Sequence, residues 1–361
     1  MKYTEINYPD LFVKVKLSQF DKEYHAIIEG NNTRLNAATQ YANMENAVGA
    51  LQNELPVGSK LIFKRYFVSD AINHAPLLPI SDTVTTSIVQ QPPLNGTKVT
   101  LWAYFVENSN PHYKHIFHTQ LHNHSEDEFT QTEEIFEAYH SELKKQRLSL
   151  ADNCIRTWIF VQGVDTHYAG MVKARKLHFY KQGLTEHTHY IASTGIEGKY
   201  LHPGTTVLMD AYAISGIVPE QITYIKGASH FSPTHKYGVT FERATAVDYG
   251  DRRHIFVSGT ASIDNKGQIV FPLDIVKQVE RTLENISVLL AEGGAEMTDM
   301  AQLIVYLRDT ADYAVVSDYL DQHLPAMPKV IVWAPVCRPG WLVEMECIAV
   351  KAADNADYEV F

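Results

Sequence analysis

Residues 131–161, QTEEIFEAYHSELKKQRLSLADNCIRTWIFV, align without a gap on residues 278–308, QVERTLENISVLLAEGGAEMTDMAQLIVYLR. The identities are few, but the apolar pattern coincides, and Phe136 falls on Leu283 at the core position of both stretches. Each stretch has the periodicity of an amphipathic helix followed by a buried strand. We interpret the pair as two copies of one unit. The alternative is chance similarity between two amphipathic stretches.

The flanking sequence extends this match. In the C-terminal half, strands are expected at 254–258, 302–307, 330–334 and 342–350, with helices at 273–291 and 313–323. The N-terminal half has the same order, with helices near 128–147 and 168–181 and strands at 155–161 and 207–214. The predicted fold is α+β, with two tandem sheets each backed by two helices. The expected domains are residues 1–220, which carry extra N-terminal elements, and residues 238–361.

The two copies differ at one informative position. The closing strand of the C-terminal copy reads Glu344 before Met345, where the N-terminal copy reads Leu208 before Met209. An acid at a position that is apolar in the sister copy is a candidate functional group. A solvated carboxylate at a strand edge is the alternative.

Composition excludes several classes of function. The chain has 361 residues, 45% of them hydrophobic and 20% charged, which is typical of a compact globular protein. Its net charge of −11 disfavours binding to nucleic acid or to an anionic membrane. Three cysteines are too few for a disulfide framework, and we find neither a signal segment nor a long apolar run. We therefore expect a cytoplasmic protein with no nucleic-acid or membrane partner.

Several motifs in the C-terminal half resemble the RidA/YjgF family. They are SGTASI at 258–263, QVERTLENI at 278–286, VYLRD at 305–309 and VEMECIAV at 343–350. Further motifs extend the resemblance to the two-domain chorismatase branch of that family: RTW at 156–158, ASTGI at 192–196, LMDAYAI at 208–214 and CRPG at 337–340. Together they cover about residues 95–350. The resemblance implies that both predicted sheets have the RidA/YjgF-like (chorismate-mutase-like) fold.

The resemblance also implies an activity. Chorismatases cleave pyruvate from chorismate and leave a dihydroxycyclohexadiene carboxylate or a hydroxybenzoate. Such chemistry needs a proton for the vinyl carbon, stabilisation of an oxocarbenium ion and cations for two carboxylates. The implied catalytic residues are Glu344 and Cys337, and the implied substrate-binding residues are Arg156, Arg338, Tyr212, Thr194, Gly195 and Thr260. No cofactor is implied, and the resembled proteins suggest a homotrimer that binds a small anionic substrate.

Each of these residues also has a plain structural interpretation. Arg156 in an apolar strand suits a carboxylate, but it also suits pairing with a structural acid. Arg338 before Pro339 can be a turn residue, Tyr212 a core aromatic and Cys337 a small hydrophobe. The segment at 193–196 can be a simple turn.

Two departures keep other functions open. The SGTASI segment runs directly into the short turn DNKG at 264–267, without the insertion expected of a chorismatase. Pro328 is followed by Lys329, where a RidA-type imine deaminase has an arginine shortly after this proline. The alternatives are therefore an enamine or imine deaminase and a non-catalytic protein that binds small carboxylates.

One further cluster is a candidate metal site. The stretch at 112–124 holds five histidines, and the spacing of His115, His118 and His122 could align imidazoles on a helix. A polar connector explains the same residues, and we predict no metal.

Overall fold

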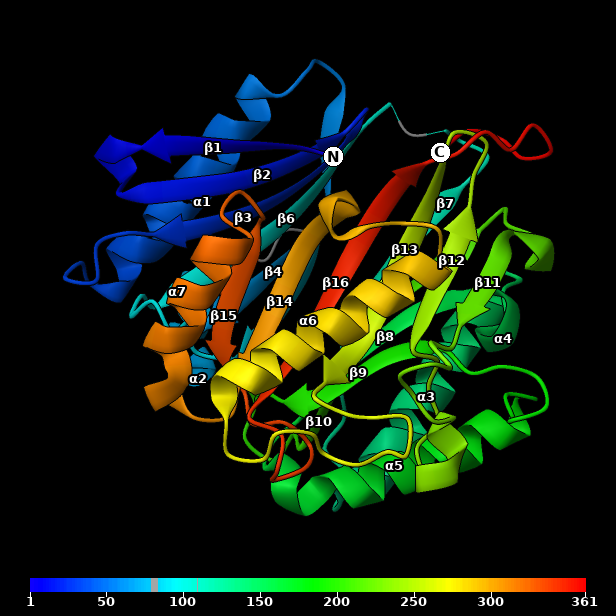
Figure 1. The fold of residues 1–361 in the computed structure, drawn as a ribbon. Helices are drawn as coiled ribbons and strands as arrows, with labels where there is room; N and C mark the ends of the chain where they lie inside the picture. The colour runs from blue at the N-terminus through cyan, green and yellow to red at the C-terminus, as the bar shows by residue number, and fades with distance from the viewer. Residues whose placement is uncertain (79–83, 109) are drawn as a thin grey trace.

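The computed structural model describes residues 1–78, 84–108 and 110–361. It contains three β-sheets, and each is formed by one consecutive part of the chain (Figure 1). We call these parts the N-terminal, middle and C-terminal units. The α+β class is as predicted, and the structure adds a third sheet.

The N-terminal unit is a six-stranded sheet in the order β1-β2-β3-β6-β4-β5. Its elements are β1 (Lys2–Tyr8), β2 (Val13–Phe20), β3 (Glu23–Gly30), α1 (Ala37–Glu54), β4 (Ser59–Val68), α2 (Ala71–His74), β5 (Thr85–Gln90) and β6 (Val99–Glu107). The sequence predicts only extra elements in this part of the chain, whereas the structure shows a complete sheet covered by α1.

The middle unit is a four-stranded sheet in the order β7-β10-β8-β9. Its elements are β7 (Lys114–Leu121), α3 (Glu128–Lys145), α4 (Leu150–Asn153), β8 (Cys154–Val161), α5 (Val164–Lys181), β9 (Ala192–Glu197) and β10 (Val207–Ser215). The Asp127 carboxylate caps α3 by accepting the backbone N–H of Thr130 at 2.8 Å. The helices predicted near 128–147 and 168–181 are therefore present, and α5 begins four residues earlier than predicted.

The C-terminal unit repeats the six-stranded order as β11-β12-β13-β16-β14-β15. Its elements are β11 (Ile222–Ile225), β12 (Ala244–Asp248), β13 (Arg252–Ala261), α6 (Ile275–Glu292), β14 (Met300–Leu307), α7 (Tyr313–His323), β15 (Lys329–Trp333) and β16 (Val343–Ala352). In all three sheets one pair of strands is parallel, namely β4 with β5, β8 with β9 and β14 with β15. This shared topology identifies the units as three versions of one fold.

Strand register makes the equivalence exact to the residue. On the closing strands, Glu344 pairs with Tyr306, Leu208 with Phe160 and Thr100 with Phe67. These three pairs stand at the same step of the ladder, one residue in from Val343, Val207 and Val99. The positions of Glu344 and Leu208, equated from sequence, therefore coincide in space, and Thr100 is the third member.

The units close into a ring. Strand β5 contacts β7, β9 contacts β13, and β14 contacts β3, so each unit touches both others in the same sense. One apolar core runs through all three, with Trp102, Trp158 and Phe256 among its members. The helices α1, α5 and α6 lie on the outside (Figure 1). Three interfaces between units result.

None of the helices in the described ranges is both long and apolar enough to cross a membrane.

Candidate functional site

A cavity of about 510 Å³ lies at the interface between the middle and C-terminal units. Helix α5 and strand β9 form one wall, and β13, β16 and the segment before β16 form the other. Its lining residues are Tyr168, Arg175, Ser193, Gly195, Val239, Phe241, Arg243, Gly259, Ala261, Ile263, Cys337, Arg338, Trp341 and Glu344. The cavity therefore combines one acid and three arginines with apolar and aromatic surface.

Glu344 is the acid of this cavity. Its side chain is 5% exposed, and burial together with the nearby charge of Glu346 raises its pKa to about 8. Gly259 makes room for it, because a Cβ at that position would collide with Glu344 Oε1. At neutral pH the carboxyl group holds its proton, so it can serve as a proton donor.

A buried charge pair lies directly behind Glu344. Glu346 accepts hydrogen bonds from Arg156 Nη2 at 2.8 Å and from Trp158 Nε1 at 2.6 Å, and the Thr194 hydroxyl donates to the same carboxylate. Both Arg156 and Glu346 have side chains only 2% exposed. Arg156 is therefore held by a structural acid and supports the cavity from the rear.

Arg175 supplies a cation inside the cavity. It is 1% exposed, its Nη1 donates weakly to Ser193 Oγ at 3.4 Å, and its Nε and Nη2 have no hydrogen-bond partner in the described part of the chain. Burial lowers its pKa. A buried guanidinium with unused donors is costly unless it binds an anion.

Two further arginines come from the C-terminal unit. Arg243 lies over the rings of Phe231 and Phe241, at 4.6 and 5.2 Å from their centroids. Arg338 lies over the ring of Trp341 at 5.2 Å. The aromatic rings orient both guanidinium groups at the cavity wall. With Arg175 they give this site the charge to hold a dianion.

Cys337 lines the same cavity. Burial, and to a lesser degree the neighbouring Glu344 charge, raises the pKa of its thiol to about 12. The group is therefore a neutral thiol at physiological pH.

The predicted site residues divide into three groups. Glu344, Cys337, Arg338 and Gly195 line the cavity. Arg156 and Thr194 lie behind it, and Thr194 Oγ1 also accepts the backbone N–H of Gly259 at 2.9 Å. Thr260 is buried and donates to the Ser258 carbonyl at 2.9 Å.

Tyr212 lies away from this cavity, in a small apolar cavity at the centre of the ring. Its hydroxyl shares a 2.7 Å hydrogen bond with His115 Nδ1.

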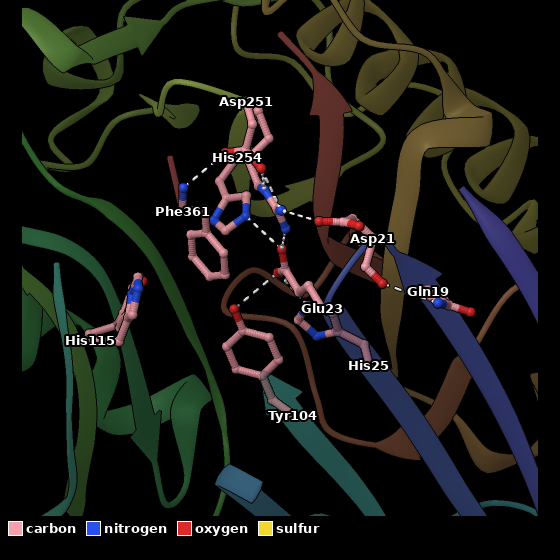
Figure 2. A network of polar contacts seen from close by, with 11 residues as sticks. Gln19, Asp21, Glu23, His25, Tyr104, His115, Asp251, His254 and Phe361 are labelled. Carbon is pink, nitrogen blue, oxygen red and sulfur yellow. Dashed lines mark hydrogen bonds and ion pairs between the residues drawn. The ribbon is translucent and has the colours of Figure 1, made fainter. Parts of the chain in front are cut away.

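A polar cluster beside this central cavity joins the N-terminal and C-terminal units (Figure 2). Glu23 accepts from Arg252 Nη1 at 3.1 Å, contacts His254 Nε2 at 2.9 Å and accepts from Tyr104 at 3.0 Å. Burial alone would raise the pKa of Glu23, but the charges and hydrogen bonds of His254 and His25 hold it well below its usual value. The acid is thus an ionised, fully paired structural group.

The predicted residues omit two arginines, Arg175 and Arg243. Both leave a signal in the sequence. Arg175 stands at the apolar period of its helix, beside Met171 and Ala174, and Arg243 lies between Phe241 and Ala244. Arg156 is predicted as a site residue because a charge stands at an apolar position, and Arg175 and Arg243 have the same property.

The histidine-rich stretch is strand β7 rather than a helix, so the spacing of three and four residues does not align the imidazoles. Within the described ranges, no group of three or more His, Cys, Asp or Glu side chains is arranged to hold a metal ion.

Comparisons with known proteins agree with this architecture. The family model described as Endoribonuclease L-PSP matches residues 242–351. A RutC family protein of Pyrococcus abyssi is 38% identical over 101 residues, which are 27% of this chain and 78% of that protein. A 2-iminobutanoate/2-iminopropanoate deaminase of Capra hircus is 28% identical over 113 residues, 31% of this chain and 80% of that protein.

A solved structure shares most of this arrangement. The crystal structure of a chorismatase superposes with a TM-score of 0.64 at 18% identity, covering 80% of this chain and 92% of the other. At this identity the match describes the fold, which is chorismatase-like.

Proposed function

This chain belongs to the RidA/YjgF family of RutC and endoribonuclease L-PSP proteins, and we propose that it is an enzyme that releases pyruvate from chorismate or a related enolpyruvyl carboxylate. One observation carries the proposal: Glu344, with a pKa of about 8, lies in a cavity that three arginines also line. A protonated acid and a surplus of cations are what an enolpyruvyl dianion requires.

The proposed reaction begins with proton transfer from Glu344 to the methylene carbon of the enolpyruvyl group. The resulting oxocarbenium ion is stabilised by the carboxylate that Glu344 has become. In the hydrolytic outcome, water adds to this cation, and the hemiketal collapses to pyruvate and a dihydroxycyclohexadiene carboxylate, with a proton returned to Glu344. In the aromatising outcome, chorismate gives pyruvate and a hydroxybenzoate without net uptake of water.

We assign the substrate carboxylates to Arg175 and Arg338, which lie on opposite walls of the cavity. Planar guanidinium groups bind carboxylates through paired hydrogen bonds. Cys337 is proposed to influence which ring product forms, and its neutral thiol is suited to act as a weak hydrogen-bond donor. Arg156, Thr194 and Thr260 are proposed to position strands around the cavity, rather than to touch substrate as the resemblance implies.

The second candidate is hydrolysis of a small imine or enamine to a carbonyl compound and ammonia. The names of the curated relatives favour it, since they include imine and aminoacrylate deaminases. Glu344 would serve equally well as the acid. Three arginines exceed what the single carboxylate of such an imine needs, and this favours the dianionic substrate. A protein that binds small carboxylates without turnover is the third candidate.

The test is incubation of the purified chain with chorismate, with pyruvate measured by a coupled assay and ring products resolved by chromatography. Pyruvate formation supports the proposal, and the ring product assigns the outcome. Ammonia release from 2-iminopropanoate without turnover of chorismate would refute this proposal and support the second candidate, hydrolysis of an imine or enamine. Binding of chorismate without release of pyruvate or ammonia would leave only the third candidate, a protein that binds small carboxylates without turnover.

Matched variants make the test specific. Arg175→Met should raise KM for chorismate at least tenfold, because it removes a buried carboxylate partner. Lys176→Met changes the next residue of the same helix, which is exposed, and should leave KM unchanged.

Two further properties are proposed. Three free cysteines suit a reducing compartment such as the cytoplasm. The oligomeric state is the second property, and light scattering against the chain mass of 40.8 kDa distinguishes the homotrimer that the resemblance implies from a single-chain particle. The closed ring of three units within one chain favours a single-chain particle over three associated chains.

A further inference from the structure

A second cavity, of about 650 Å³, lies beside the Glu344 cavity at the interface between the middle and C-terminal units. The connection between α5 and β9 forms one wall, and the connection between β11 and β12, residues 226–243, forms the other. Phe241 and Arg243 line both cavities. These two side chains therefore form a partition between an inner cavity, which contains Glu344, and this outer one.

The two cavities differ in their access to solvent. The described residues that line the inner cavity are all buried or half-buried. Six residues that line the outer cavity are exposed, namely Glu186, Thr188, Lys226, Ala228, Pro233 and His235. The outer cavity thus lies between the inner cavity and solvent.

The connection that carries the partition is longer than its counterpart in the N-terminal unit. There, β1 and β2 are joined by residues 9–12, whereas the equivalent strands β11 and β12 are joined by residues 226–243. The longer connection supplies Phe231, Phe241 and Arg243. It is an addition to the repeated fold, and it stands at the interface that contains Glu344.

The partition is a stack of side chains on a fixed backbone. The Arg243 guanidinium lies between the rings of Phe231 and Phe241, and its Nη2 donates weakly to the Ser232 carbonyl at 3.4 Å. The backbone beside it is anchored, because the Glu242 carboxylate accepts the backbone N–H of Tyr190 at 2.8 Å. Side chains can rotate on a fast timescale without movement of the strands. The partition can therefore open while the sheet stays in place.

Arg243 can act on both sides of the partition. It lines the outer cavity, and its charge also reaches Glu344, where it opposes the effect of burial on the pKa of that acid. A guanidinium has five N–H donors in a fixed plane, so it can bind one carboxylate from either cavity.

The charges of the outer cavity suit passage of an anion rather than its retention. Lys226 and Arg243 are balanced there by Glu186 and Glu242. The inner cavity has three arginines and one acid that holds its proton at neutral pH. An anionic ligand is therefore attracted from the outer cavity to the inner one.

We propose that the outer cavity is the entrance to the Glu344 site, and that Arg243 takes the substrate carboxylate at the partition and transfers it inward. The inference rests on the proposed function, since its ligand is a small ring carboxylate. Phe231 and Phe241 offer apolar faces to the ring of such a ligand while Arg243 holds its carboxylate.

The experiment is stopped-flow binding of 3-hydroxybenzoate to the whole chain, followed by protein fluorescence, to which Trp341 of the inner cavity contributes. Ala228→Phe narrows the outer cavity at an exposed position. It should lower the association and dissociation rate constants alike, by about fivefold or more, and leave Kd unchanged. An obstacle on a route slows entry and exit equally, whereas damage to the inner site changes Kd.

Two variants at the partition separate charge from shape. Arg243→Met removes the cation and should slow association about tenfold at low salt, and Arg243→Lys should retain most of the rate. The control is Lys236→Met, which removes an exposed charge of the same connection that lines neither cavity. It should leave both rate constants as in wild type.

Wild-type rate constants in both Ala228→Phe and Arg243→Met would overturn the inference and leave the proposed function intact. A weaker Kd with unchanged association in Ala228→Phe would also overturn it, since the outer cavity would then belong to the binding site itself. Absence of 3-hydroxybenzoate binding to wild type would overturn the proposed function, and this inference with it.

Discussion

The interface between the N-terminal and middle units and the interface between the middle and C-terminal units both bury an arginine–carboxylate pair. At the first, Arg65 Nη2 lies 2.9 Å from Asp210 Oδ2, with both side chains 0% exposed. At the second, Arg156 pairs with Glu346. At the first interface the Glu344 position is Leu208, which is 1% exposed and belongs to the continuous apolar core.

This comparison shows which side chains distinguish the interface that holds a cavity from the interface that is closed by apolar packing. A buried ion pair is common to both, so it serves the packing of the units. The cavity and the poised acid occur where Glu344 replaces Leu208 and Gly259 leaves room for its carboxyl group. The same fold thus supplies one interface closed by apolar packing and one that holds a cavity with a buried acid, by changing few side chains.

Removal of one partner from the structural pair should have the largest effect. Asp210→Asn leaves the buried Arg65 guanidinium without its counter-charge, and we expect a loss of about 3–5 kcal/mol in the free energy of unfolding. Urea denaturation at pH 7 measures it. A loss below 1 kcal/mol would show that the pair does not hold this interface together.

Two variants serve as controls for Asp210→Asn. The double variant Arg65→Met with Asp210→Leu replaces both charges by apolar groups and should recover most of the stability. Glu346→Gln removes the equivalent partner at the second interface. It should cost similar stability, and it should also lower the pKa of Glu344, because Glu346 is a charge that raises it.

The next largest effect is on activity. Glu344→Gln keeps the size of the side chain and removes its proton, and we expect kcat to fall at least ~100-fold while the fold is retained. Steady-state kinetics with chorismate measure kcat, and a circular-dichroism spectrum shows whether the fold is retained. The reciprocal change, Leu208→Glu, should create no activity and should destabilise the chain, because an acid would enter an apolar core. Wild-type turnover in Glu344→Gln would refute the assignment of the acid.

The fold could be predicted largely from periodicity, because helices such as α3 and α6 have strong amphipathic patterns and their order is repeated. The N-terminal unit could not be recognised in this way. Its helix α2 is only four residues long, so the second helix of the pattern is nearly absent. The equivalence of its strands becomes visible only through hydrogen-bond register, which depends on pairing between distant segments.

The candidate site could be predicted in part. Glu344 was found because its sister position is apolar, and the same comparison works wherever two copies differ in charge. The sequence predicts that Arg156 binds a substrate carboxylate, and in the structure its guanidinium pairs with Glu346. Which side of a strand meets an adjacent unit depends on how the ring closes, and local sequence carries no signal for that.

A smaller effect links the acid to stability. In the unfolded chain Glu344 releases its proton near pH 4.5, but in the folded chain only near pH 8. Between these values the folded state binds more protons, so the free energy of unfolding falls as pH rises. The free energy of unfolding of Glu344→Gln should exceed that of wild type by roughly 1–3 kcal/mol at pH 8.5 and should equal it at pH 4.5. Urea midpoints at the two pH values test this, and a pH-independent difference would contradict the shifted pKa.

The smallest expected effect is at an exposed pair across the same interface. Arg308 Nη2 and Nη1 bind Asp165 at 2.8 and 3.0 Å, but the Asp165 side chain is 51% exposed. Asp165→Asn should therefore cost less than about 1 kcal/mol, and the loss should shrink in 1 M salt.

Asp165 also lies in the first turn of α5, where a negative charge favours the helix dipole. Arg308→Met breaks the same pair and keeps that carboxylate, but it also removes the hydrogen bond from Arg308 to the Val336 carbonyl. The difference between the two variants therefore combines the contribution of the helix with that of this hydrogen bond. If Arg308→Met cost as much as Asp210→Asn, the geometry of a pair rather than its burial would decide how strongly the units are joined.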